Sequence, residues 1–126
     1  MAAGATFEPI ATYTVPSNTA SYTFSSIPNT YTHLYIICNL KNSGVNGVDF
    51  FIRINGDTSN SYVNTRIGSN TNSRTTTRQS AGAGYYQLFF NTAGSAVNTY
   101  VVGEIWIPFY TRSATKSIHT YGGCNQ

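Results

Sequence analysis

Charged side chains are scarce in this sequence. Only 9% of its 126 residues are Asp, Glu, Lys or Arg, whereas about a quarter is usual for soluble domains. The polar surface must therefore come from the abundant Ser, Thr, Asn and Gly residues. Few charges mean weak repulsion between copies, and the ten tyrosines belong to a residue type enriched in interface cores. This composition is typical of a permanent assembly.

The residues that carry most catalysis are also few. The sequence has four acids and two histidines, and His33 and His119 lie in no recognisable motif. General acid and base catalysis needs paired carboxylates, and a nucleophilic triad needs a base held by an orienting group. A calcium loop needs several acids close together, and the four acids are scattered. We therefore expect a binding or structural protein that is not an enzyme and uses no metal or other cofactor.

Cysteine pairs, long apolar runs and dense basic runs are missing as well. Cys38, inside an apolar segment, and Cys124 make neither a disulfide framework nor a zinc site. No apolar run approaches the ~18 residues of a membrane span, and the first residues lack a signal-peptide pattern. The net charge of +3 comes from scattered side chains. We therefore expect synthesis in the cytoplasm and neither a membrane nor a nucleic-acid partner.

Apolar residues recur at every second position and nowhere at helical spacing, which predicts strands alone. The strongest run has apolar side chains on both faces, which predicts a strand covered on both sides. Pro, Asn and Gly turn signals, Asn55-Gly56 among them, separate the runs. The expected strands are 11–15, 22–24, 31–40 (the strongest), 48–54, 62–67, 74–79, 85–90, 99–109 and 114–121. About eight or nine short strands of this kind predict an antiparallel β-sandwich of jelly-roll type.

The domain organisation is simple. Residues 1–10 are expected to form an N-terminal arm and residues 11–126 a single β-sandwich domain. Within this domain, residues 58–84 are almost wholly polar, and we expect an excursion that is either a projecting loop or a surface that meets a partner. Its local excess of positive charge, solvated or facing a subunit, comprises Arg66, Arg74 and Arg78.

Seven aromatic residues between positions 85 and 121 are candidates for a binding surface. Where two neighbours lie in one strand, one of them must point outward. Three roles are open to these side chains: a subunit interface, the core, or stacking on a sugar ring as in β-sandwich lectins. They are Tyr85, Tyr86, Tyr100, Trp106, Phe109, Tyr110 and Tyr121.

Four segments carry a family resemblance. They are FSSIPNTYTHLYIICNLKNS (24–43), FFIRINGDTSNSYVNTRI (50–67), GEIWIPFY (103–110) and KSIHTYGG (116–123). Together they resemble a group of tailed-bacteriophage virion proteins, small jelly-roll domains that occur as capsid decoration or cement proteins and as tail-fibre-associated modules. The resemblance implies a fold and a virion setting, and it carries no catalytic residue.

Members of this group continue past the KSIHTYGG-like strand with further apolar strands, whereas this sequence ends at Gln126. We therefore expect an open sheet edge in the sandwich. A neighbouring subunit or a capsid protein would cover that edge by strand addition.

The resemblance and the composition together predict a virion structural protein made in the host cytoplasm. We expect a capsid decoration protein, a homotrimer on the head surface that bridges capsomers by binding the major capsid protein. The alternative is a tail-fibre or tail-tip receptor-binding module that recognises a host surface glycan. The candidate interface residues are Phe7, Glu8, Pro9, Ile10, Arg66, Arg74, Arg78, Tyr85, Trp106, Tyr110 and Tyr121.

Overall fold

Every regular element in the described part of the chain is a strand. The computed structural model describes residues 7–41, 50–70, 73–89, 100–113 and 116–124. All of its strand pairs are antiparallel, so the predicted all-β, antiparallel class is confirmed. The strands are β1 (His33–Lys41), β2 (Phe50–Ile52), β3 (Tyr62–Asn70), β4 (Ser73–Ala83), β5 (Tyr86–Phe89), β6 (Tyr100–Pro108) and β7 (His119–Cys124).

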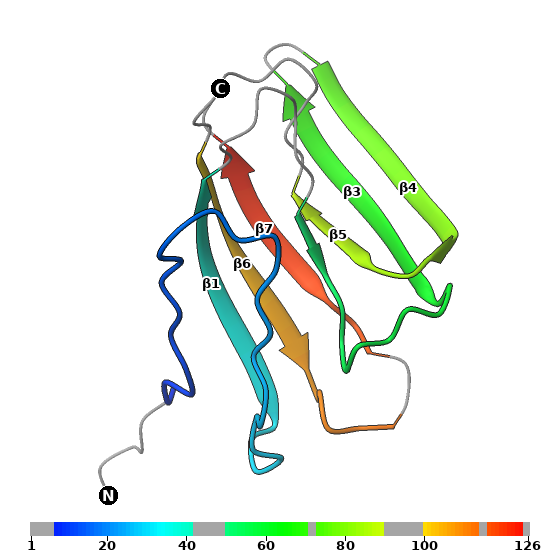
Figure 1. Ribbon diagram of the computed structural model, residues 1–126. Helices are drawn as coiled ribbons and strands as arrows, with labels where there is room; N and C mark the ends of the chain where they lie inside the picture. Colours follow the sequence, from blue (N-terminus) through cyan, green and yellow to red (C-terminus); the bar gives the residue numbers. More distant parts are fainter. Residues whose placement is uncertain (1–6, 42–49, 71–72, 90–99, 114–115, 125–126) are drawn as a thin grey trace, which may run out of the picture.

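These strands form three small sheets (Figure 1). One has three strands in the order β1-β6-β7, and the pairs β2-β5 and β3-β4 make the other two. Hydrogen bonds link strand β5 to the β3-β4 pair and to the segment that enters β7. Its Gln87 carbonyl accepts a hydrogen bond from the Asn64 Nδ2 of β3 at 3.4 Å, and its Tyr86 hydroxyl donates to the Ile118 carbonyl before β7 at 3.3 Å. A two-layered jelly roll stays a prediction.

The core lies on one face of β6, the middle strand of the three-stranded sheet. Val101, Ile105 and Ile107 are 0 to 2% exposed. Across the ladder, Leu34 is opposite Ile107 and Ile36 is opposite Ile105. These β1 side chains are only half-buried, because no described strand lies beyond β1. The apolar residues at every second position of these two strands therefore form this inner face.

The two strands predicted at residues 11–15 and 22–24 are wrong. Residues 7–32 form a segment that belongs to no sheet, and we call it the extended arm. Its apolar side chains are largely exposed, with Tyr13 at 37% and Tyr22 at 50%. Alternation alone does not make a strand, because a strand also needs a neighbour that supplies ladder hydrogen bonds and a surface that covers one face.

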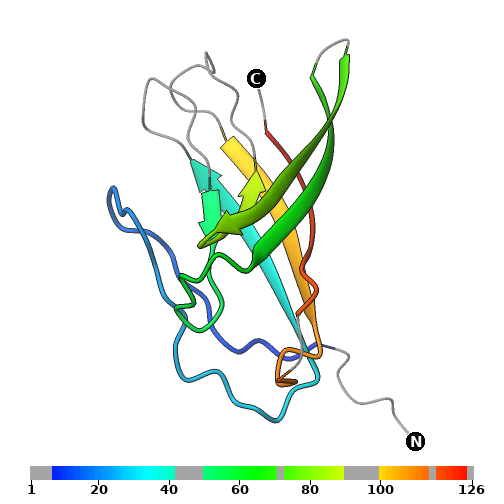
Figure 2. The same ribbon diagram turned by 90° about the vertical axis from the view of Figure 1, so that its right-hand side faces the viewer.

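The polar excursion is a hairpin rather than a loop. The strands predicted at 62–67 and 74–79 are confirmed as the longer strands β3 and β4, which pair from Tyr62 opposite Ala83 to Asn70 opposite Ser73. Figure 2 shows this hairpin at a steep angle to the strands of the three-stranded sheet. Ladder hydrogen bonds use only the backbone, so a polar, Thr-rich sequence can form them without a core.

Three further predictions concern two turns and the last strand. The turn after β2 is confirmed, because Asn55 and Gly56 have φ angles of 54° and 67°. The last strand begins at His119 instead of 114 and continues through the glycines to Cys124. Gly122 lies opposite Gly103, and this pair has no side chains to hinder a close backbone ladder. The Asn46-Gly47 turn signal lies outside the described residues.

Candidate functional site

The second face of the three-stranded sheet is open to solvent in the described part of the chain. The prediction that the strand 31–40 is covered on both sides is therefore wrong. Ile37 is 72% exposed, Val102 is 53% exposed and Tyr121 is 81% exposed. We call this surface the outer face; its residues are His33, Tyr35, Ile37, Asn39, Lys41, Tyr100, Val102, Glu104, Trp106, His119 and Tyr121.

The strand register sets these side chains in two rows across the sheet. One row runs Tyr35, Trp106, His119, and the next runs Ile37, Glu104, Tyr121. Side chains directly opposite each other in antiparallel strands have Cβ atoms about 5 Å apart, so each row is a set of neighbours. The outer face therefore combines large apolar and aromatic groups with one carboxylate, Glu104, and one ammonium group, Lys41, which lies over the Tyr100 ring.

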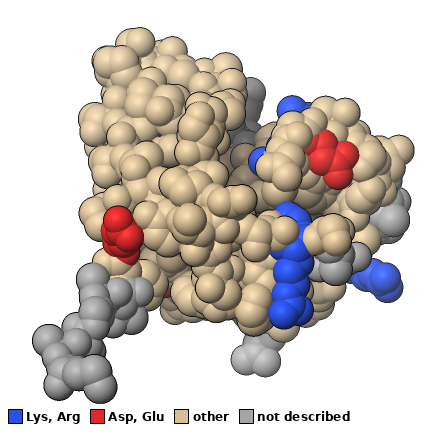
Figure 3. All heavy atoms as spheres, turned by 90° about the horizontal axis from the view of Figure 1, so that it is seen from below, with Lys and Arg blue, Asp and Glu red and all other residues tan. Residues whose placement is uncertain are grey.

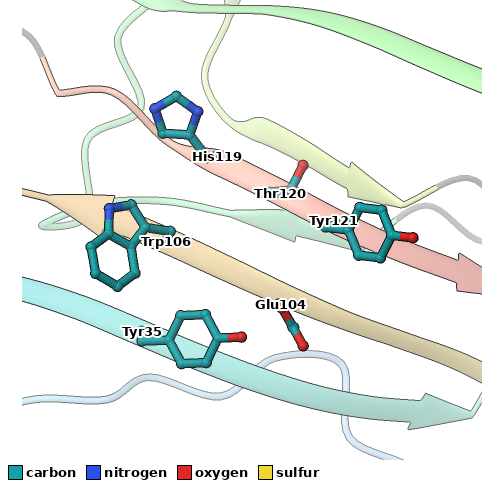
Figure 4. A pocket seen from close by; sticks show the side chains of 6 residues that line it. All are labelled: Tyr35, Glu104, Trp106, His119, Thr120 and Tyr121. Carbon is teal, nitrogen blue, oxygen red and sulfur yellow. The ribbon is translucent and has the colours of Figure 1, made fainter. Parts of the chain in front are cut away.

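A shallow hollow of about 140 Å³ lies in the middle of this face (Figure 4). Tyr35, Glu104 and Trp106 line one part of it, and the rest is lined by His119, Thr120 and Tyr121. Figure 4 shows the Tyr35 hydroxyl directed toward Glu104. The hollow has the size of one small group, well below the ~300 Å³ at which pockets for drug-sized ligands begin.

Hydrogen bonding couples the tyrosine and the acid of the hollow. The Tyr35 hydroxyl donates to the Glu104 carboxylate, and this bond is the main reason that the pKa of Tyr35 is raised, followed by desolvation and the negative charge of Glu104. The carboxylate keeps further lone pairs. It can therefore accept a hydrogen bond from a group that enters the hollow.

Replacing Glu104 by glutamine is expected to lower the pKa of Tyr35 toward the ordinary value of a tyrosine. A neutral amide removes the charge that opposes tyrosinate, and it accepts a weaker hydrogen bond than a carboxylate does. Carbon-13 NMR of labelled tyrosines across alkaline pH measures the change. Tyr31 is the internal control, because its pKa is raised first by burial and then by Glu8. Equal shifts of both tyrosines would contradict the Tyr35 to Glu104 bond.

Ring contacts extend the hollow into an aromatic band. The centroids of Phe7 and Tyr35 are 5.7 Å apart, and those of Tyr35 and Trp106 are 5.9 Å apart. His33 stacks on Trp106 at 5.2 Å and meets the Phe109 ring at 4.7 Å. The backbone N–H of Phe109 donates to His33 Nδ1 at 3.2 Å, which orients the imidazole. Such pairs stabilise the arrangement beyond simple area burial.

Three of the predicted interface residues come together at this site. Trp106 and Tyr121 line the hollow, and Phe7 contacts Tyr35 at its margin. Tyr110 lies beyond the end of β6, where its hydroxyl donates to the Pro28 carbonyl of the extended arm.

The other predicted residues lie elsewhere. Tyr85 packs on Phe51 with ring centroids 4.1 Å apart, beside the β2-β5 pair. Glu8 hydrogen-bonds to Tyr31 within the extended arm, where Pro9 and Ile10 are exposed. The three predicted arginines are part of the β3-β4 hairpin and not of the outer face: Arg66, Arg74 and Arg78.

Sequence reasoning missed four residues of the hollow: Tyr35, Glu104, His119 and Thr120. Glu104 was findable, because it lies two positions from Trp106 and so shares its strand face. The positions of Tyr35 and His119 beside Trp106 depend on the register of β1 and β7 against β6. The alternating pattern indicates the face of each residue, but it does not indicate which strands pair. The structure brings Tyr35 next to Trp106, which lies about seventy positions later in the chain, and His119 next to Trp106 from the following strand.

The charge pattern of the described surface is sparse. Figure 3 shows isolated acidic and basic side chains on a face that otherwise belongs to uncharged residues. The described residues contain no helix that is long and apolar enough to cross a membrane. They also contain no group of three or more His, Cys, Asp and Glu side chains placed to hold a metal ion.

Comparisons with protein-family models, with curated proteins and with solved structures find no match for this chain. The case for a function therefore depends on the residues and their geometry.

Proposed function

We propose that this chain is a structural subunit whose outer face packs against other proteins, and more specifically a capsid decoration protein of a virion. One observation carries the proposal. The described residues bury only three hydrophobic side chains fully, while fifteen large hydrophobic side chains are exposed, five of them together on the outer face: Tyr35, Ile37, Tyr100, Val102 and Tyr121. Soluble monomers rarely leave apolar side chains gathered in one patch, and such patches mark interaction surfaces.

The outer face has the composition of an interface core. Aromatic side chains are enriched in such cores and charged side chains are depleted. Glu104 is the only acid of the outer face, and its bond to Tyr35 already satisfies part of its hydrogen-bonding capacity. Covering this face therefore removes Ile37, Val102 and Tyr121 from water without burying an unpaired cluster of charge.

Stabilisation of a shell by such a subunit needs no catalysis. A protein that binds the assembled shell but not its separated parts stabilises the shell by mass action. The resemblance of four sequence segments to tailed-phage virion proteins supports the virion setting, with the major capsid protein as the partner. A homotrimer would suit a head surface whose capsomers meet at threefold positions.

Phage heads that lack this protein provide the test. We expect the purified chain to bind them saturably, in a copy number set by capsomer symmetry. Bound heads should open at a higher temperature, which light scattering or calorimetry measures. An absence of binding to heads, together with immunogold labelling of tails, would overturn the decoration role.

A second candidate function is recognition of a host glycan by a tail module. The observation that favours it is the hollow, where the rings of Tyr35, Trp106 and Tyr121 surround the Glu104 carboxylate. Aromatic faces stack on sugar rings, and a carboxylate accepts hydrogen bonds from sugar hydroxyls. Saturable binding to host polysaccharide that the Trp106→Ala change abolishes, with the protein located in tails, would favour this candidate over the shell.

A further inference from the structure

The extended arm has the sequence of a strand and the structure of an unpaired segment. Ala11, Tyr13 and Val15 alternate with Thr12 and Thr14, which is the pattern of a strand with one apolar and one polar face. No residue from 7 to 32 takes part in a strand ladder. Tyr13 and Val15 are 37% and 48% exposed. The arm therefore carries an apolar face that no strand of the described chain covers and that is partly open to solvent.

Both ends of the extended arm are held on their own subunit. Phe7 contacts the Tyr35 ring at 5.7 Å, and the Tyr110 hydroxyl donates to the Pro28 carbonyl near the entry to β1. Between these two anchors the arm crosses in front of β1 in Figure 1 and stands away from the three-stranded sheet in Figure 2. The middle of the arm is therefore available to another molecule while its ends stay in place.

An aromatic cluster gives the middle of the arm a defined shape. The rings of Tyr13 and Tyr22 stack with centroids 3.5 Å apart, and Phe24 meets Tyr22 edge to face at 4.9 Å. Residues 13 and 22 thus lie side by side, as opposed residues of a hairpin do. A segment that is already organised loses less conformational freedom when it binds.

The matching acceptor is the free edge of β1. This strand has nine residues, His33–Lys41, and among the described strands it pairs only with β6. A long unpaired edge presents a row of backbone donors and acceptors to any strand that approaches. The inner-face side chains of β1 are only half-buried, unlike their neighbours on β6: Leu34, Ile36, Cys38 and Leu40.

We propose that residues 11–15 of one copy add as a strand to the free edge of β1 in a second copy of this chain. Tyr13 and Val15 then extend the inner face beyond Leu34 and Ile36, and Thr12 and Thr14 join the outer face, which the added strand leaves open to solvent. The inference rests on the proposed assembly function and names a second copy of this chain as the partner of the β1 edge. The contact between the arm of one copy and the β1 edge of the next is head-to-tail. Such contacts close a ring, for example a trimer, when the rotation between copies allows it.

Two double variants of the full chain test this proposal. We expect Tyr13→Lys/Val15→Lys to reduce the oligomer to a monomer, because two ammonium groups would enter the inner face. Thr12→Lys/Thr14→Lys places the same charges in the same segment on the solvent-open outer face, and we expect it to leave the oligomer intact. Sedimentation equilibrium at several concentrations measures the mass of each variant.

Cys38 and the amides of the arm give independent readouts. In a Cys124→Ser background, we expect the Cys38 thiol to react with a thiol reagent at least about tenfold faster in the monomeric variant, because thiol reactivity follows access. Hydrogen exchange should show residues 11–15 protected in the wild-type oligomer and unprotected in the monomeric variant. A monomeric wild type, or equal masses for the two double variants, would overturn the proposal that the arm adds to β1 of a second copy. If the chain forms an oligomer and binds heads while residues 11–15 exchange freely, the arm proposal fails and the assembly function stands.

Discussion

Replacing Ile107 by alanine is expected to lower the free energy of unfolding by about 2 to 5 kcal/mol, the usual cost of truncating a buried isoleucine. Ile107 is 1% exposed in the middle strand of the three-stranded sheet and lies opposite Leu34. The loss combines the transfer energy of the removed carbons with the cavity that they leave. Because domains of this size are stable by only about 5 to 15 kcal/mol, the variant should lose a large share of its stability.

Val102→Ala is the matched control for this change. Val102 lies on the same strand but on the outer face, where it is 53% exposed, and surface changes of this kind are usually within about 0.5 kcal/mol. Urea denaturation at a fixed protein concentration measures both variants, because association shifts the apparent stability. Equal losses for the two variants would mean that the two faces of β6 are buried alike in the working protein.

Replacing Ile37 by lysine is expected to weaken binding to the phage head at least about tenfold. Full burial of such a side chain contributes about 1.5 to 3 kcal/mol, and a factor of ten in affinity corresponds to about 1.4 kcal/mol. The new ammonium group adds a desolvation cost in an interface that offers it only Glu104, the cross-strand neighbour of Ile37. Because Ile37 is 72% exposed, the stability of the free chain should change little.

Ile67→Lys provides the control for the outer face. Ile67 is 77% exposed on β3, in the hairpin that carries the three predicted arginines, and the chemical change is the same. We expect this variant to bind heads as the wild type does. Co-sedimentation of heads with each variant over a range of concentrations gives the affinities. Loss of binding by Ile67→Lys but not by Ile37→Lys would move the contact surface from the outer face to the hairpin.

The candidate site was partly accessible from the sequence. Trp106 and Tyr121 were predicted as interface residues because neighbours in a strand point to opposite faces. Their meeting with Tyr35, Glu104 and His119 depends on ladder register, which arises from backbone pairing between distant segments. Side-chain type alone therefore indicated candidate interface residues, but it could not predict which of them lie next to one another.

The sequence by itself determined that this chain is all-β, since period-two alternation and turn residues such as Asn55-Gly56 act over a few neighbouring positions. It also determined the low charge and the excess of aromatic groups. Only the tertiary structure decided which alternating segments become strands. Residues 33–41 found partners in β6, whereas residues 11–15 carry an equally regular pattern and remain outside every ladder. The difference is a neighbouring strand, because the hydrogen bonds and the covered face that complete a strand come from outside its own sequence.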